Sequence, residues 1–302
     1  MNLPSPPANS GLRTLVLTDS GLGGLLIGAE LERRLRESGS GGAVRLVYVN
    51  AWPDPGYGYN DLADLAARAA VFDRALAAMI AFGPSAIVIA CNTLSVVYKA
   101  TAFHGSPVVP VTGILDEGVE LFFEALNRDD ESVLAVFGTR TTIGSGEHLR
   151  RLRARGIDPA RLAAEACHGL AAAIDKDPDS PAVPGLVDAC VLRVLPGLLS
   201  GGKVYAGLAC THYAYVAEIF RGALARHAGA AVETLDPGER LVEKLTADLA
   251  AAGPAAGPVT VEVVSKVELA GSQRRAVARR LEAISPATAL ALLDYHHVSH
   301  LF

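Results

Sequence analysis

Two apolar runs that each end in Ala-Cys constrain the fold of this chain more than any other feature of its sequence. The first run, Ala86-Ile-Val-Ile-Ala, leads into Cys91, and the second, Val204-Tyr-Ala-Gly-Leu-Ala, leads into Cys210. An apolar run without polar alternation is typical of a strand buried on both faces, as in parallel sheets. Ligands of such sheets bind just beyond the carboxyl ends of the strands. The sequence therefore predicts both thiols where a ligand would lie.

Strand and helix patterns alternate along the rest of the chain. Strands are expected at 14–18, 44–49, 108–111, 133–137, 232–235 and 259–264 in addition to the two runs above, and helical segments follow most of them. Such alternation predicts parallel sheets joined by right-handed crossovers. We therefore expect an α/β protein.

The spacing of the motifs indicates an internal duplication. Asp19 lies 72 residues before Cys91, and Thr139 lies 71 residues before Cys210. We therefore expect two pseudo-symmetric, Rossmann-like α/β/α domains with mostly parallel sheets, which face each other across a cleft and supply one cysteine each. The first domain is predicted to comprise residues 13–112 and 232–302, the second 113–231, and residues 1–12 a flexible tail.

Composition argues against several kinds of partner and site. The formal net charge is −5 and no basic run is present, so a nucleic-acid partner is not expected. No apolar segment reaches the roughly 18 residues of a membrane helix, so no membrane partner is expected. The four cysteines have no close-paired spacing and the C-terminal histidines have no fixed ligand geometry, so no metal is expected. Free thiols and the lack of a signal-peptide pattern favour a cytoplasmic location.

Two thiols on opposite sides of a cleft can hold one substrate carbon between them. A thiol at a helix N-terminus can lose its proton near neutral pH, because the helix dipole stabilises the thiolate. One sulfur would remove a proton and the other would deliver one to the opposite face, which inverts a stereocentre without a cofactor. Asp19 is expected beside Cys91 and His212 beside Cys210, where each can tune the thiol proton. The short polar side chains expected to hold a charged substrate are Ser20, Asn92, Thr93, Thr139, Thr142 and Thr211.

These residues lie in motifs that resemble the aspartate/glutamate racemase superfamily, and within it the glutamate racemases most. The motifs are Asp19-Ser-Gly-Leu-Gly-Gly-Leu25, Ala90-Cys-Asn-Thr93, Gly138-Thr-x-x-Thr142 and Cys210-Thr-His-Tyr213, in the right order within roughly residues 13–285. The resemblance implies a pyridoxal-independent racemase with Cys91 and Cys210 as the catalytic pair, assisted by Asp19 and His212. It also implies a small acidic amino acid as substrate, a homodimer, and a role in supplying D-glutamate to peptidoglycan. The substrate contacts that it implies are Ser20, Asn92, Thr93 and Thr211.

Several positions depart from the pattern of that family. Gly56-Tyr57-Gly58 replaces the usual Pro-Tyr-Gly loop, in which Tyr57 and Gly58 are expected to contact the substrate. Leu94 follows Cys-Asn-Thr where a small residue is usual, so we expect it to reshape the pocket wall. Asp175 stands where a glutamate is usual, as a candidate auxiliary residue. These departures leave open a racemase or isomerase of aspartate or of another carboxylated substrate.

Several of these residues also have simpler structural explanations, and other functional classes remain possible. Asp19 fits a helix N-cap as well as a proton-handling role, and we expect both. The glycines at 21, 23 and 24 lack the G-x-G-x-x-G spacing, so NAD is not expected. Cys167 and Cys190 lack flanking motifs and are expected to be structural. The alternatives from other classes are a non-catalytic ligand-binding relative and a Cys-His hydrolase, which would leave the second thiol unexplained.

Overall fold

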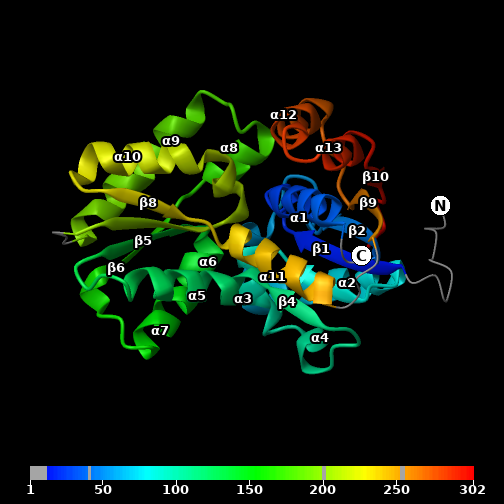
Figure 1. Ribbon diagram of the computed structural model, residues 1–302, viewed down its shortest axis with the longest axis horizontal. Coiled ribbons are helices and arrows are strands. Elements are labelled where there is room, and N and C mark those ends of the chain that lie inside the picture. Colours follow the sequence, from blue (N-terminus) through cyan, green and yellow to red (C-terminus); the bar gives the residue numbers. More distant parts are fainter. Residues whose placement is uncertain (1–11, 40–41, 199–201, 252–255) are drawn as a thin grey trace.

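The computed structural model describes residues 12–39, 42–198, 202–251 and 256–302, so all but the last residue of the expected tail, 1–12, lies outside it. The described residues form two sheets (Figure 1). The strands of the first sheet are β1 (Arg13–Asp19), β2 (Gly42–Asn50), β3 (Ala86–Ile89), β4 (Val111–Gly113), β9 (Ala256–Ser265) and β10 (His296–His297). Those of the second are β5 (Val133–Gly138), β6 (Leu162–Ala166), β7 (Val204–Ala209) and β8 (Val232–Leu235).

The two sheets repeat one strand order, as the predicted duplication requires. Within the described residues the first sheet runs β10-β9-β2-β1-β3-β4 and the second β6-β5-β7-β8. The pairings between neighbouring strands are parallel in both sheets. The order β2-β1-β3-β4 therefore matches β6-β5-β7-β8, so Cys91 and Cys210 follow equivalent strands. The predicted α/β class with parallel sheets is confirmed.

Helices cover both faces of each sheet. Side chains alternate between the faces of a strand, so Leu15 and Leu17 enter one core and Val16 between them enters another. In β5, Leu134 and Phe137 likewise enter separate cores. The helices around the first sheet are α1 (Leu25–Ser38), α2 (Leu65–Met79), α3 (Asn92–Tyr98), α4 (Ala102–Gly105), α11 (Pro237–Ala251), α12 (Gly271–Glu282) and α13 (Pro286–Leu293). Those around the second are α5 (Ile114–Leu126), α6 (Arg140–Gly144), α7 (Glu147–Ala154), α8 (Leu170–Lys176), α9 (Ala182–Val194) and α10 (Ala217–Ala228).

Short 3₁₀ helices connect several of these elements. They are η1 (Tyr59–Asp61), η2 (Ile80–Phe82), η3 (Pro159–Arg161), η4 (Leu195–Gly197) and η5 (Thr211–Val216). Across the residues that the structure describes, no helix combines the length and the apolar character needed to cross a membrane.

The chain passes from the first sheet to the second after β4 and returns after β8 (Figure 1). The predicted boundary after residue 231 is corrected here, because β8 pairs in parallel with β7 and so belongs to the second sheet. Helix α11 then packs against both α1 and α5. We propose two units on this basis: the first sheet with its helices, called the first unit, and the second sheet with its helices, called the second unit.

A buried ion pair in the first sheet gives a prediction for stability. Arg45 of β2 is 5% exposed; its guanidinium donates two hydrogen bonds to Glu262 of β9, at 2.7 and 2.8 Å, and one to the carbonyl of Phe82. We expect Arg45→Met to lower the free energy of unfolding by about 2 kcal/mol at pH 7, because it leaves both acceptors unpaired. Urea denaturation followed by circular dichroism measures the loss.

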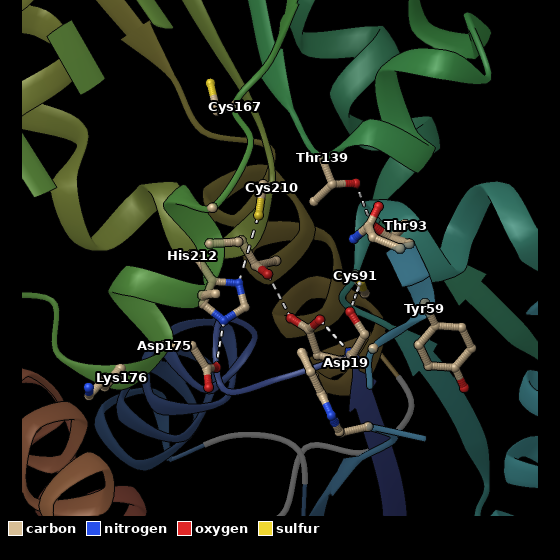
Figure 2. Close-up of a pocket in the computed structure, with 18 of the residues that line it drawn as sticks. Asp19, Tyr59, Cys91, Thr93, Thr139, Cys167, Asp175, Lys176, Cys210 and His212 are labelled. Atoms are coloured by element: carbon tan, nitrogen blue, oxygen red, sulfur yellow. Dashed lines mark hydrogen bonds and ion pairs between the residues drawn. The ribbon is translucent and has the colours of Figure 1, made fainter. Parts of the chain in front are cut away.

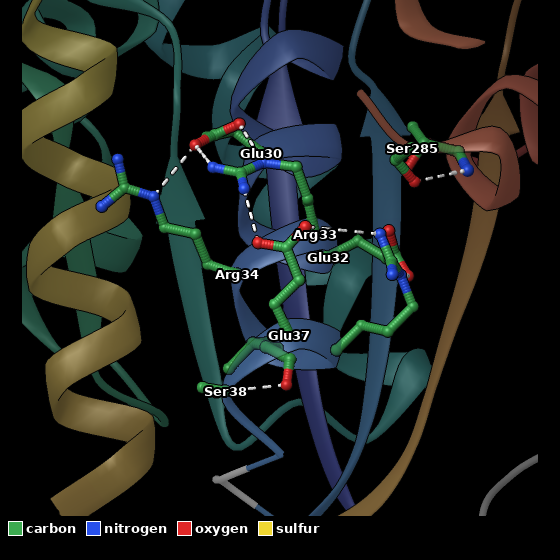
Figure 3. Close-up of polar contacts among 10 residues, drawn as sticks. Glu30, Glu32, Arg33, Arg34, Glu37, Ser38 and Ser285 are labelled. Atoms are coloured by element: carbon green, nitrogen blue, oxygen red, sulfur yellow. Dashed lines mark hydrogen bonds and ion pairs between the residues drawn. The ribbon is translucent and has the colours of Figure 1, made fainter. Parts of the chain in front are cut away.

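The pH dependence of this loss follows from Glu262. The hydrogen bonds with Arg45 lower the pKa of Glu262 below its ordinary value, so the pair contributes stability at neutral pH and loses it as pH falls through that lowered pKa. The control is Arg33→Ala in the surface network of α1, where Arg33 is only partly buried and contacts Glu30 and Glu37 (Figure 3). Exposed pairs of this kind contribute little. An equal loss in both variants would contradict the assignment of Arg45.

Candidate active site

The site lies where the carboxyl ends of the two sheets face each other. Strands β1 and β3 lead to Asp19 and Cys91, and strands β5 and β7 lead to Thr139 and Cys210. All four residues line one cavity of about 500 Å³, which both units enclose (Figure 2). The sequence placed ligand-binding groups at the ends of parallel strands, and the structure brings the two sets together.

Cys91 is the N-cap residue of α3 and lies close to two polar groups of the β1 turn. Its side chain accepts a hydrogen bond from the amide of Leu94, and its sulfur lies 3.2 Å from the Ser20 hydroxyl. Burial raises the pKa of the Cys91 thiol well above its ordinary value, and the negative charge of Asp19 raises it further. These two effects outweigh the amide of Leu94 and the hydroxyl of Ser20, which both lower the pKa of the thiol.

Cys210 has a histidine and a carboxylate behind it. Its sulfur lies 3.7 Å from Nδ1 of His212, and Nε2 of His212 lies 2.7 Å from Oδ1 of Asp175 in α8 (Figure 2). We call Cys210, His212 and Asp175 the Cys210 relay. Burial by itself would lower the pKa of His212, but the hydrogen bonds with Asp175 and Cys210 outweigh it and raise this pKa well above its ordinary value. The raised pKa favours the protonated imidazole, the form in which both ring nitrogens can donate a hydrogen bond.

Asp19 joins the two units. Its Oδ2 accepts hydrogen bonds from the hydroxyl of Thr211, at 2.6 Å, and from the amide of Gly24, at 2.7 Å. Its Oδ1 accepts the amide of Ser20 at 2.6 Å. The expected N-cap role is corrected, because the N-cap residue of α1 is Gly24; Asp19 instead accepts amide hydrogens of the turn that precedes this helix. The same carboxylate therefore holds Thr211 of the second unit against the first unit.

Part of the cavity wall is polar and is formed by Asn92, Thr93 and Thr139. The hydroxyl of Thr93 lies 2.8 Å from that of Thr139, which again joins the two units (Figure 2). Asn92 beside it is 1% exposed and lines the cavity. Neither polar atom of the Asn92 amide has a hydrogen-bond partner among the residues that the structure describes. Because buried polar groups are almost always paired, this amide is a strong indication of a polar ligand.

Three sequence-based expectations about the cavity wall are corrected. Tyr57 does not line the cavity: its side chain is 46% exposed and its hydroxyl donates to the carbonyl of Asp61. Thr142 lies behind the wall, where its hydroxyl contacts those of Thr93 and Thr139. Leu94 is fully buried in the core beneath α3 and does not reshape the pocket. The remaining expected residues line the cavity, namely Ser20, Gly58, Asn92, Thr93, Thr139, Asp175, Thr211 and His212.

The cavity also contains residues that the sequence did not indicate. Those with side chains that bear polar or aromatic groups include Trp52, Arg140, His168, Lys176 and Gln273. Gln273 is contributed by α12, far along the chain from every motif. Cys167 lines the wall as well, but its sulfur points away from Cys210 (Figure 2). Cys190 is buried in the core of the second unit, as expected.

Comparison with known proteins gives the class of this chain. The profile of the Asp/Glu/Hydantoin racemase family matches residues 27–245. The glutamate racemase of Roseiflexus sp. (strain RS-1) is 29% identical over 207 residues, which cover 68% of this chain and 70% of the relative. Fold and sequence together define an isomerase, an amino-acid racemase that uses no cofactor.

The chain belongs to the Asp/Glu/Hydantoin racemase family. Solved structures with the same fold include glutamate racemase isoform RacE1 from Bacillus anthracis, with a TM-score of 0.70 and 20% identity over 90% of this chain and 95% of that one. Another is the glutamate racemase of Francisella tularensis in complex with D-glutamate, with a TM-score of 0.65 and 18% identity over 95% of each chain.

Proposed function

We propose that this protein interconverts L- and D-glutamate by proton transfer at the α-carbon between Cys91 and Cys210. The observation that carries the proposal is the pair of buried thiols at equivalent strand ends in one cavity, each with its own acid–base neighbour. Glutamate is proposed because the similar proteins above are glutamate racemases, one of them bound to D-glutamate. Since Leu94 is absent from the cavity wall, the main sequence argument against glutamate no longer applies.

The neighbours of the two sulfurs favour different protonation states and therefore different roles for the two cysteines. A protonated imidazole beside a sulfur stabilises a thiolate, and His212 lies beside Cys210, so we assign Cys210 the role of the base that removes the first proton. Cys91, with its raised pKa, is the neutral thiol and therefore the acid. The Cys210 thiolate takes the α-proton, and the resulting carbanion takes a proton from Cys91 on the opposite face. The configuration inverts, and Cys91 becomes the thiolate.

The remaining polar groups hold the substrate and reset the protons. The unpaired Asn92 amide supplies a donor and an acceptor for a carboxylate and an ammonium group. Asp19 and His212 exchange protons with Cys91 and Cys210 between turnovers. The other proposed substrate contacts are Ser20, Gly58, Thr93, Thr139 and Thr211.

The biological setting is proposed from similarity alone. Glutamate racemases of this family resemble the chain over most of its length. On that ground we propose a cytoplasmic homodimer that supplies D-glutamate for peptidoglycan.

Proton NMR in deuterated buffer tests the proposed reaction. With L-glutamate we expect the α-proton signal to disappear while D-glutamate accumulates to an equal amount, because each inversion delivers a solvent-derived deuteron. Aspartate in a parallel sample is the control for specificity. Exchange with aspartate but not with glutamate would keep the two-thiol chemistry and replace the substrate. No exchange with either would favour a non-catalytic ligand-binding relative.

A further inference from the structure

The carboxylate of the Cys210 relay is held by groups from the other unit. Asp175 lies in α8 of the second unit, but its Oδ1 accepts the amide of Leu22 at 2.8 Å, from the turn after β1. Its Oδ2 accepts the side-chain amide of Gln273, from α12 of the first unit. Among the described residues, the Asp175 carboxylate has three hydrogen-bond partners, namely Leu22, His212 and Gln273. Of these, only His212 belongs to the second unit, as Asp175 does.

We propose that Gln273 is a positioning residue, which holds Asp175 against His212 and so makes the Cys210 relay depend on contact between the two units. The inference rests on the proposed two-thiol function. Gln273 acts through Asp175 and needs no contact with the reacting atoms. Its amide donates to the oxygen of Asp175 that His212 does not use, so it fixes the carboxylate plane.

Asp175 needs the hydrogen bond from Gln273 to keep its orientation, because its carboxylate is partly exposed. The Asp175 side chain keeps 17% of its surface open and lines the cavity. Without Gln273, Oδ2 faces the cavity and water, and the carboxylate can rotate away from His212. A hydrogen bond to a charged group contributes more to stability than one between neutral groups. Its loss should therefore weaken the relay while the fold remains intact.

The carboxylate of Asp19, in the first unit, is likewise held by a residue of the opposite unit. Asp19 beside Cys91 accepts the hydroxyl of Thr211 from the second unit, at 2.6 Å. Each thiol thus has an acid–base neighbour that the opposite unit holds in place. The Cys91 side uses Thr211 and the Cys210 side uses Gln273, so the two sides can be perturbed separately.

Single-thiol variants make this separation measurable. With Cys91→Ser only Cys210 can exchange an α-proton, and with Cys210→Ser only Cys91 can. Deuterium incorporation into each enantiomer of glutamate then reports one thiol at a time. We expect Gln273→Leu to slow exchange through Cys210 about tenfold or more, and to change exchange through Cys91 less than about twofold. Gln273→Met is the second variant, in case leucine disturbs the packing of α12.

The matched control is Arg275→Gln, an exposed position on α12 that does not line the cavity, which should leave both exchange rates unchanged. The ¹⁵N chemical shifts of the His212 ring should change in both Gln273 variants and not in the control, which tests the contact without turnover. Equal slowing through both thiols, or unchanged His212 shifts, would overturn the inference for Gln273. If neither single-thiol variant exchanged the α-proton of either enantiomer for deuterium, the proposed function would fail. The ¹⁵N shifts of His212 would still decide whether Gln273 positions Asp175.

Discussion

Replacing either Cys91 or Cys210 by serine should lower kcat/KM for glutamate racemisation about 10³-fold in both directions. Serine keeps the shape of the side chain, but its hydroxyl is a much weaker acid than a thiol, and general acid–base catalysis contributes about 10²–10⁴-fold. A 10³-fold loss corresponds to about 4 kcal/mol of transition-state stabilisation. Coupled assays of D- and L-glutamate formation measure both directions.

The two variants should also differ from each other. The remaining thiol can still remove and return a proton on its own face, so each variant should exchange the α-proton of one enantiomer without racemising it. Opposite enantiomer preference in the two variants is the signature of two bases. Cys190→Ala is the control, because this thiol is 1% exposed in the core of the second unit. Full racemisation by Cys210→Ser in both directions would contradict the proposal.

The sequence predicted the strand ends of the site because they depend on local pattern. An apolar run that stops at a cysteine specifies a buried strand and the group at its end, and Cys91 and Cys210 follow this rule. Because the prediction depends on local pattern, it missed the edge strand β6, whose sequence lacks a typical strand pattern. Its residues, Leu162-Ala-Ala-Glu-Ala166, are mostly small or polar and only partly buried, so they lack the β-branched and aromatic character of strands.

The parts of the site that depend on packing were not accessible from sequence. Leu94 is adjacent to the motif in sequence, but helical geometry turns its side chain into the core beneath α3. Gln273 lies far from every motif and meets Asp175 only because α12 packs against α8. The raised pKa of the Cys91 thiol also depends on packing, because burial and the charge of Asp19 outweigh the groups that lower it. Local motifs therefore identified the reacting groups, and tertiary packing determines their proton affinities.

The glycine-rich turn after β1 allows the two units to pack closely against each other. A Cβ atom at Gly23 would lie 2.7 Å from both the amide nitrogen and Nδ1 of His212, and would also meet the Thr211 hydroxyl. A Cβ at Gly21 would lie 2.9 Å from Oδ1 of Asp175. Real Cβ atoms essentially never come closer than 3.0 Å to such groups. These glycines are needed because the turn of one unit packs directly on the Cys210 relay of the other.

Gly23→Ala should therefore lower kcat/KM about 100-fold, since a displacement of roughly 1 Å at a reacting group has an effect of that size. The added methyl must push η5 away from the β1 turn, which moves His212 relative to Cys210 and weakens the hydrogen bond from Thr211 to Asp19. Racemisation kinetics together with a crystal structure of the variant measure both effects.

The matched control for Gly23→Ala is Gly28→Ala on α1, where the nearest atom to a new Cβ is Cδ2 of Leu17 at 4.0 Å. Alanine is favoured over glycine within a helix by about 0.5–1 kcal/mol, so this variant should be as active as the parent and slightly more stable. If Gly23→Ala kept the parental kcat/KM, the β1 turn could move without disturbing the relay. The two units would then meet less tightly than the contacts around His212 require, and close packing would not be what holds the Cys210 relay together.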